Sequence, residues 1–247
     1  MSRTTGHEFA AFQRRFGDTP WSAVLAAAQA DAPASHEAWE RLARGYWYPL
    51  YAYIRRTGRP PQDAKDLAQA FFLNLMECRK LDGVVPGQRR FRSFLLTCLK
   101  HFLADDYRRS QATQRRPQGG FLNWDDAVAE RRYQGELVDH ATPEFLFEHN
   151  WAGAILDQAL EELEAHYVAR KKHELFEHLV MHLVSPANAV PHAELAAKLG
   201  MAEGSVRNAL RHLRRRYQLL CRRLVAVTVP AQEVEAEMSH LRRVLTR

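Results

Sequence analysis

The chain has 247 residues, and with 46% hydrophobic residues it can bury one large core or two small ones, which excludes disorder throughout. Lysine and arginine number 35 against 29 acidic residues, and the net charge of +6 suits a polyanionic partner without demonstrating one. Three widely spaced cysteines indicate neither a disulfide framework nor a metal site, and no apolar run approaches the roughly 20 residues that cross a bilayer, so we expect a cytosolic protein.

Apolar residues recur at three- and four-residue spacing along almost the whole chain, and neither alternating β-branched runs nor Asn-Gly hairpin turns appear. The sequence therefore predicts an all-α fold. Thr19 and Pro20 are typical of the start of a helix over about 20–30. Ser35 can cap the next helix, which Pro49 should kink.

A further helix is predicted over residues 61–79. Its inward face collects apolar residues at helical spacing, namely Ala64, Leu67, Ala68, Phe71 and Leu75. The opposite stripe holds Asp66, Gln69, Ala70 and Leu73. A bare alanine beside an exposed leucine is unusual on a surface that meets only water, so we expect this stripe to contact a partner.

The next helix, over residues 91–109, combines a clean apolar stripe with cationic side chains. The cations and the histidine that it presents are Arg92, Lys100, His101, Arg108 and Arg109, with Phe91 and Tyr107 interleaved. Single-stranded nucleic acid is bound in this way, because rings stack on unpaired bases while cations follow the phosphates. Since most of the rings belong to the core, a purely structural helix stays open as an alternative.

Helical periodicity fails from Ser110 to about Thr142, which predicts a flexible linker, and returns in a second helical domain. Helices are expected over about 144–166 and 170–184, followed by two short ones between 192 and about 223. The apolar spacing of the tail predicts a last helix, docked on this second domain. The chain then divides into an N-terminal helical extension (1–35), a first domain (36–110), a linker (111–142), a second domain (143–225) and a C-terminal helical extension (226–247).

Residues 191–217 have the pattern of a helix-turn-helix. Ala196 is small where two helices must touch, Gly200 follows where the turn needs a left-handed backbone, and Val206 can anchor the second helix. The outward face of that helix carries Ser205, Arg207, Asn208, Arg211, Arg214 and Arg215. Arginine and asparagine can bind base edges and the later arginines suit phosphates, whereas the alternative is a solvated basic face.

Other chemistry has little support in the sequence. Glu174, His178 and His182 recur at four-residue spacing, but no obvious fourth metal ligand accompanies them. Phosphate-cradling glycine loops and nucleophile elbows are absent. We therefore expect no enzymatic activity, no metal and no cofactor.

The order of these segments resembles a bacterial RNA polymerase sigma factor of the extracytoplasmic-function (ECF) type. The resemblance rests on YWYPLYAYIRR (46–56), DAKDLAQAFF (63–72), FRSFLLTCLKHFLADDYRR (91–109) and the helix-turn-helix. It implies that residues 36–110 are similar to sigma region 2, which binds the polymerase clamp and opens the minus-ten element. Residues 144–223 are similar to region 4, which reads the minus-thirty-five element and touches the polymerase flap. The linker would thread the polymerase near its active centre.

The resemblance also implies roles for single residues. The polymerase-binding residues would be Asp63, Asp66, Gln69, Phe72 and Leu73; the readers of the melted strand Arg92, Lys100, His101, Arg108 and Arg109; and the duplex readers the outward residues of the helix-turn-helix. Family members read close to DAEDLxQExF at 63–72, whereas this chain has Lys65 and Ala70 in place of two acids. Binding to core polymerase is therefore expected to be weakened or conditional.

Thr57 offers one hypothesis for the condition, because it follows two arginines just before that helix. Phosphorylation by a Ser/Thr kinase would place about −1.5 to −2 charge near the missing acids, whereas the alternative is an ordinary turn threonine. An anti-sigma factor is a further partner to consider. The rival functions are an autonomous helix-turn-helix regulator that has lost polymerase binding, and a protein that occupies the polymerase without initiating. The C-terminal extension could mask the helix-turn-helix or complete a core.

Overall fold

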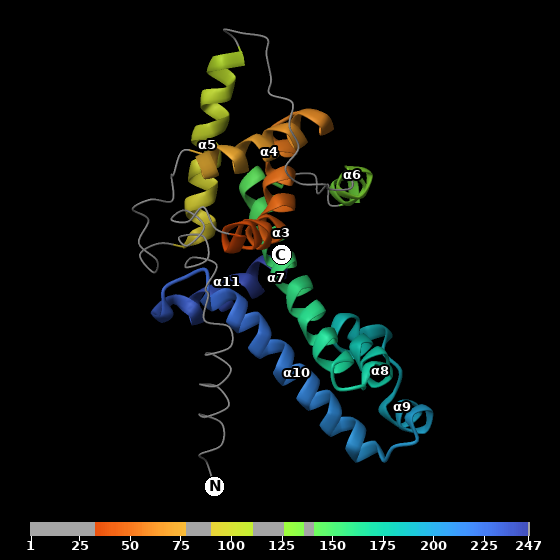
Figure 1. The fold of residues 1–247 in the computed structure, drawn as a ribbon. Coiled ribbons are helices and arrows are strands. Elements are labelled where there is room, and N and C mark those ends of the chain that lie inside the picture. The colour runs from red at the N-terminus through yellow and green to blue at the C-terminus, as the bar shows by residue number, and fades with distance from the viewer. Residues whose placement is uncertain (1–32, 78–89, 111–125, 136–140, 247) are drawn as a thin grey trace. The chain divides into compact units, whose positions relative to one another are not determined.

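The computed structural model describes residues 33–77, 90–110, 126–135 and 141–246, and every regular element in these ranges is a helix (Figure 1). The predicted all-α fold is thereby confirmed for this part of the chain. The expected helix over about 20–30 lies outside the described residues. None of the helices in the described ranges combines the length and apolarity that a membrane span requires.

The chain divides into two compact units, Met1–Ala152 with Ala226–Arg247, and Gly153–Val225. The described elements of the first unit are α3 (Pro33–Arg56), α4 (Pro61–Glu77), α5 (Phe91–Ser110), α6 (Asp126–Gly135), the beginning of α7 (Pro143–Val168), η2 (Ala231–Glu233) and α11 (Val234–Leu245). Its core is aromatic and aliphatic: Trp47, Leu50, Phe71, Leu95 and Leu99 are each at most 2% exposed.

Helix α4 buries the face that the sequence predicts, because Ala64, Leu67, Ala68, Phe71 and Leu75 are all buried. The burial extends further round the helix than expected. Gln69 is 8% exposed and Phe72 is 3% exposed, although both were expected on the partner-binding surface. Helix α3 continues through Pro49, and Gly58 has φ +92° in the turn that leads to α4, where a left-handed backbone favours glycine.

The segment predicted as a linker contains helix α6, which contacts α3. Glu130 accepts hydrogen bonds from the hydroxyl of Tyr51 (2.5 Å) and from Arg55, whose Nε and Nη2 lie 2.9 and 2.7 Å from its carboxylate oxygens. The Arg55 guanidinium also lies 4.8 Å from the centre of the Tyr133 ring. Ala129 and Tyr133 are buried, so α6 has an inward face despite its short length.

The C-terminal segment forms the predicted last helix, but its docking was predicted wrongly. Val234, Leu241 and Val244 on α11 are buried, as the apolar spacing indicates. The helix belongs to the first unit and not to the second, and its Glu237 pairs with Arg92 of α5.

The second unit contains the remainder of α7, α8 (His173–Val184), η1 (Pro186–Asn188), α9 (His192–Leu199) and α10 (Glu203–Ala226). Its core includes Leu163, Leu179, Leu195, Val206 and Leu213, each 0% exposed. Helix α10 has 24 residues, much longer than the short helix expected from the sequence. Its C-terminal half is tied to α7, because the Tyr217 hydroxyl donates to the Leu156 carbonyl (3.2 Å) and Arg223 pairs with Glu162.

Candidate nucleic-acid and polymerase interfaces

The turn between α9 and α10 has the geometry that the sequence predicts. Gly200 ends α9 in the left-handed region, with φ 61° and ψ 30°, and its N–H donates to the Ala197 carbonyl (3.3 Å). The next amide, of Met201, donates to the Ala196 carbonyl (3.0 Å), so two carbonyls at the end of α9 are satisfied. Val206 is fully buried in the first turns of α10. These contacts fix the angle at which α10 leaves the turn.

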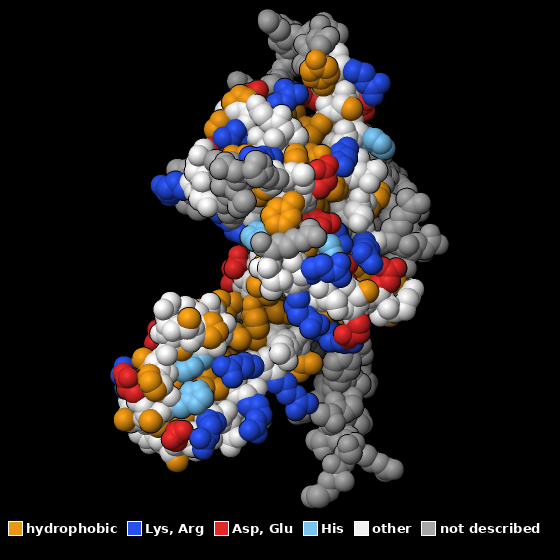
Figure 2. Space-filling model, turned by 180° about the vertical axis from the view of Figure 1, so that it is seen from behind, with side chains coloured by type: hydrophobic (Ala, Val, Ile, Leu, Met, Phe, Trp, Pro, Cys, Tyr) orange, Lys and Arg blue, Asp and Glu red, His pale blue; other side chains and the backbone are white. Residues whose placement is uncertain are grey.

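The six polar residues predicted to read duplex DNA are all exposed on α10: Ser205, Arg207, Asn208, Arg211, Arg214 and Arg215. They follow from helical periodicity, since Val206, Leu210 and Leu213 face the core. On the face seen in Figure 2, Lys and Arg side chains lie around histidines on the second unit.

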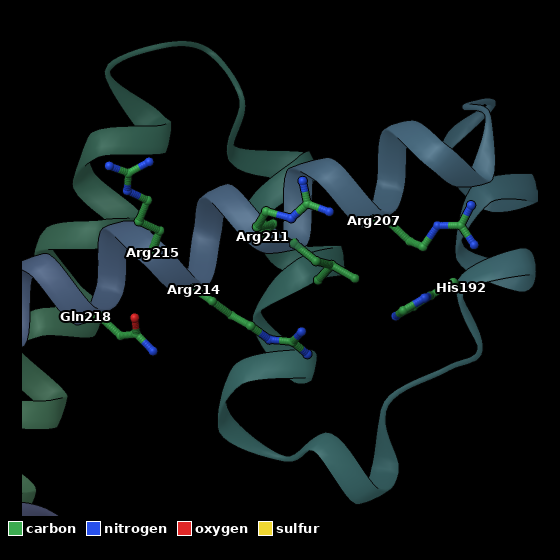
Figure 3. Close-up of a pocket in the computed structure, with 7 residues that line it drawn as sticks. His192, Arg207, Arg211, Arg214, Arg215 and Gln218 are labelled. Atoms are coloured by element: carbon green, nitrogen blue, oxygen red, sulfur yellow. The ribbon is translucent and has the colours of Figure 1, made fainter. Parts of the chain in front are cut away.

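A hollow of about 400 Å³ lies beside this face of α10 (Figure 3). It is lined by His192, Arg207, Leu210, Arg211, Arg214, Arg215 and Gln218. Sequence reasoning did not find His192 and Gln218; His192 is the first residue of α9, at the end of that helix opposite the turn. The side chains offer several N–H donors and a high density of positive charge, which suits a phosphate backbone.

The contacts that the arginines of this hollow make leave them available to a ligand. Arg207 forms an exposed ion pair with Glu203 (3.0 Å), and such pairs contribute at most about 1 kcal/mol, so a base can replace Glu203. Burial, together with His192 and Arg214, lowers the pKa of His182. His182 is therefore neutral at pH 7, and its carbonyl accepts a hydrogen bond from Arg214 (3.4 Å).

The C-terminal half of α5 presents four of the five predicted readers of a melted strand. Lys100, His101, Arg108 and Arg109 are exposed, and the ring of Tyr107 between them is 57% exposed. Lys100 lies 2.8 Å from Glu144, and this hydrogen bond raises the pKa of Lys100. The surface combines cations with a ring that an unpaired base can stack on.

The fifth predicted reader, Arg92, is buried instead, with 5% of its surface exposed. Its Nε lies 2.6 Å from Glu237, it also pairs with Glu148, and its guanidinium lies 5.2 Å from the centre of the Trp151 ring. Although burial lowers it, the bonds to Glu237 and Glu148 raise the pKa of Arg92 overall. In this conformation Arg92 is not presented to a nucleic acid.

The predicted polymerase-binding residues of α4 divide into two groups. Asp63, Asp66 and Leu73 are half-buried and reach the surface, whereas Gln69 and Phe72 are buried. The Gln62 side chain donates to Asp66 (3.1 Å). Only the first group is available to a partner without a rearrangement of the side chains.

Thr57 is exposed in the turn between α3 and α4. Its hydroxyl donates to the Ile54 carbonyl (2.7 Å), and it precedes the first residue of α4, Pro61, by four positions. A phosphate on this hydroxyl would lie close to the positive end of α4.

Comparison with known proteins finds a family model that matches part of the first unit. Residues 42–113 match the family model described as Sigma-70 region 2, a range that runs from within α3 to just beyond α5. No curated protein and no solved structure matches the chain. The matched range contains both the α4 surface and the exposed cations of α5. The match supports a sigma-factor role for this part of the chain, in binding RNA polymerase and promoter DNA.

Proposed function

We propose that the chain is a sigma factor of the ECF type, which binds core RNA polymerase and directs promoter recognition and opening. The match of residues 42–113 to region 2 carries this proposal. The chain itself performs no catalytic step; the chemistry belongs to the polymerase.

The exposed end of α5 would hold the opened strand. Lys100, Arg108 and Arg109 are placed to follow the phosphates, and Tyr107 offers a ring for an unpaired base. Arg108 lies 2.6 Å from Asp105 in an exposed ion pair, which a phosphate can displace at little cost.

Helix α10 would act as the recognition helix of a helix-turn-helix in region 4. Its first two turns present Ser205, Arg207 and Asn208, which can bind base edges in the major groove. Arg211, Arg214 and Arg215 follow along the same helix and suit the phosphates of the duplex.

The α4 surface would bind the polymerase clamp through Asp63, Asp66 and Leu73. Lys65 and Ala70, in place of acids, weaken this contact, and phosphorylation of the exposed Thr57 by a Ser/Thr kinase would restore negative charge beside it. Burial of Gln69 and Phe72 is consistent with a surface that needs activation. An anti-sigma factor that occupies α4 is the other form of control that this surface admits.

The second candidate is an autonomous DNA-binding regulator that has lost polymerase binding. The observation that favours it is that α9, the turn and nearly all of α10 lie in the second unit, outside the range that matches region 2, and that the six polar residues of α10 are exposed. Such a protein would bind its operator without a polymerase.

Reconstitution with core polymerase, followed by transcription from a genomic promoter library, tests the proposal. We expect the wild-type chain or its Thr57→Glu variant to form a holoenzyme that transcribes a small set of promoters. Failure of both to assemble with the core enzyme, when a known sigma factor assembles in the same preparation, would contradict the proposal.

A further inference from the structure

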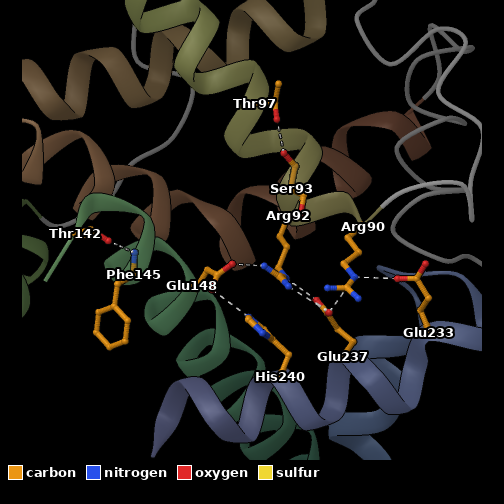
Figure 4. A network of polar contacts seen from close by, with 10 residues as sticks. All are labelled: Arg90, Arg92, Ser93, Thr97, Thr142, Phe145, Glu148, Glu233, Glu237 and His240. Atoms are coloured by element: carbon orange, nitrogen blue, oxygen red, sulfur yellow. Dashed lines mark hydrogen bonds and ion pairs between the residues drawn. The ribbon is translucent and has the colours of Figure 1, made fainter. Parts of the chain in front are cut away.

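The C-terminal segment of the chain covers the N-terminal end of α5 (Figure 4). Arg90 Nε lies 2.9 Å from Glu233 and 3.5 Å from Glu237. Arg92 binds Glu237 through Nε (2.6 Å) and Nη2 (3.4 Å). Two neighbouring arginines at the start of α5 are therefore held by two carboxylates from one short segment.

The backbone takes part in the same contact. The N–H of Phe91 donates to the carbonyl of Thr228 (3.0 Å), which satisfies one of the amides that a helix leaves unpaired at its start. That end of a helix, with its free amides and positive dipole, attracts anions. The C-terminal segment therefore occupies a position where a negatively charged strand would otherwise find both arginines and a backbone donor.

The carboxylates of the C-terminal segment resemble the phosphates of the DNA strand that α5 is proposed to bind. Carboxylate and phosphate oxygens both accept paired hydrogen bonds from the guanidinium group. Glu233 and Glu237 are four residues apart, so they present two negative charges on one side of a helical segment, as consecutive phosphates do on a strand. Glu237 is fully buried by this contact, and the Arg92 side chain is 6% exposed.

The ion pairs that Arg90 and Arg92 form with these carboxylates contribute less stability than an apolar core of the same size would. A buried ion pair contributes little net stability, since the loss of hydration offsets the attraction and apolar residues often serve better. The buried cluster also contains one poorly paired group. His240 Nε2 lies 3.1 Å from Glu148 but lacks hydrogen-bond geometry among the described residues. A group of this kind lowers the cost of separating the segment.

The segment is also short enough to detach. Helix α11 has 12 residues, a length at which an isolated helix is only marginally stable in water, so its stability depends on what it packs against. Val234, Leu241 and Val244 hold it in place through an apolar stripe.

We infer that the segment from Thr228 to Thr246 is an internal competitor of the opened promoter strand for Arg90 and Arg92. This inference rests on the proposed function, in which α5 holds that strand. In the covered state the strand binds only to the exposed end of α5; displacement of Glu233 and Glu237 extends the binding surface to the start of the helix. Promoter opening is then limited by release of the segment.

The test uses the full chain in holoenzyme, with a fluorescent base analogue in the minus-ten region to report strand opening. The double variant Glu233→Gln, Glu237→Gln removes both competing charges with little change in shape, and Glu235→Gln removes an exposed acid of the same helix as a matched control. We expect opening to be about tenfold faster in the double variant, within the usual range of coupling between sites, and unchanged in the control.

A second variant guards against loss of folding, because neutralising the buried Glu237 leaves Arg92 with Glu148 alone. Glu233→Lys leaves that buried pair intact and repels Arg90, whose side chain is 36% exposed, so it weakens only the outer part of the cover. We expect this variant to melt at nearly the wild-type temperature and to open promoters several-fold faster.

Binding of a short single-stranded oligonucleotide to the free chain separates failure of the inference from failure of the proposed function. If the holoenzyme does not open promoters but Glu233→Lys still binds the oligonucleotide more tightly than Glu235→Lys, which adds the same charge at an exposed position of α11, the sigma-factor assignment fails and the competition stands. If folded Glu233→Lys shows neither faster opening nor tighter oligonucleotide binding than Glu235→Lys, the competition is overturned.

Discussion

Thr57 is the exposed side chain at which we propose that polymerase binding is controlled. Its hydroxyl caps the carbonyl of Ile54 at the end of α3, four positions before α4 begins. A negative charge there interacts favourably with the start of α4 and adds to Asp63 and Asp66 on the surface proposed to bind the clamp.

We predict that Thr57→Glu raises the affinity for core polymerase about two- to fivefold, the effect of roughly 0.5–1 kcal/mol that a charge exerts at a helix start. Thr57→Ala serves as the control and should bind as wild type does. Ala70→Glu, which restores an acid farther along α4, should raise the affinity independently. Equal affinities of Thr57→Glu and Thr57→Ala, measured by competition with a labelled sigma factor, would remove the phosphorylation hypothesis.

The arginines of α10 are predicted to differ in role according to their position along the helix. Arg207→Ala should weaken binding to the cognate promoter by about 1–3 kcal/mol and relax the preference for one base pair. Arg215→Ala should weaken binding to all promoters alike and reduce the slope of log K against log salt by about 1. The measurement is holoenzyme binding to single-base promoter variants at several salt concentrations, and identical profiles for the two variants would contradict the assignment.

At the scale of elements, the turn after α9 depends on a backbone that only glycine adopts readily. Gly200 has φ 61°, so Gly200→Ala should lower the free energy of unfolding by about 1–2 kcal/mol. Gly204 has open space around it inside α10, and Gly204→Ala should stabilise the protein by about 0.5–1 kcal/mol as the matched control. Denaturant unfolding of both variants checks this; equal stability would show that the turn does not constrain the helix pair.

We predict that the contact of α6 with α3 weakens at low pH. The hydrogen bond from Arg55, aided by Tyr51 and Gln134, lowers the pKa of Glu130 to about 2 from an ordinary value of 4.5. A lowered pKa means that the contact contributes its full stability above about pH 4.5 and loses it as pH falls toward 2. The protection of residues 126–135 against hydrogen exchange, taken relative to the intrinsic exchange rate at each pH, should therefore fall over that interval in wild type. In Glu130→Gln the exchange should be fast already at pH 7, and a wild-type rate in this variant would contradict the account.

Local patterns predicted most of the individual helices, but they predicted neither helix α6 nor the place where α11 docks. The inward face of α4, the left-handed Gly200 and the exposed row on α10 all follow from spacing within one or two helices. Helix α6 has only ten residues, and its inward face rests on two residues, Ala129 and Tyr133, too few to produce a clear period. The site of α11 depends on the pairing of Arg92 with Glu237, which are 145 positions apart, and no local rule selects that partner.

The residues of the candidate DNA-binding surfaces were also predicted correctly in some positions and not in others. Arg207 and Arg214, on the outer face of α10, are exposed as their helical spacing predicts. Arg92 is also a cation on a long helix, but the fold brings the carboxylates of Glu148 and Glu237 to it. Exposure of a charged residue is therefore predictable only where no distant segment can cover it.

For the proposed function, the whole molecule needs a partner that brings its α5 and α10 surfaces to separate promoter elements. The region 2 domain carries the α4 surface and the cationic end of α5, and the second unit carries the basic face of α10. Each surface alone offers few specific contacts, and affinity rises steeply only when both bind one DNA at a fixed spacing. Core polymerase would supply that spacing.

A mobility-shift comparison on a promoter recovered from the library tests this claim most directly. The binding reactions contain the chain alone, core polymerase alone and both together. The account predicts a sequence-specific complex only when both are present. Specific binding of the promoter by the chain alone, with an affinity that core polymerase does not change, would contradict it.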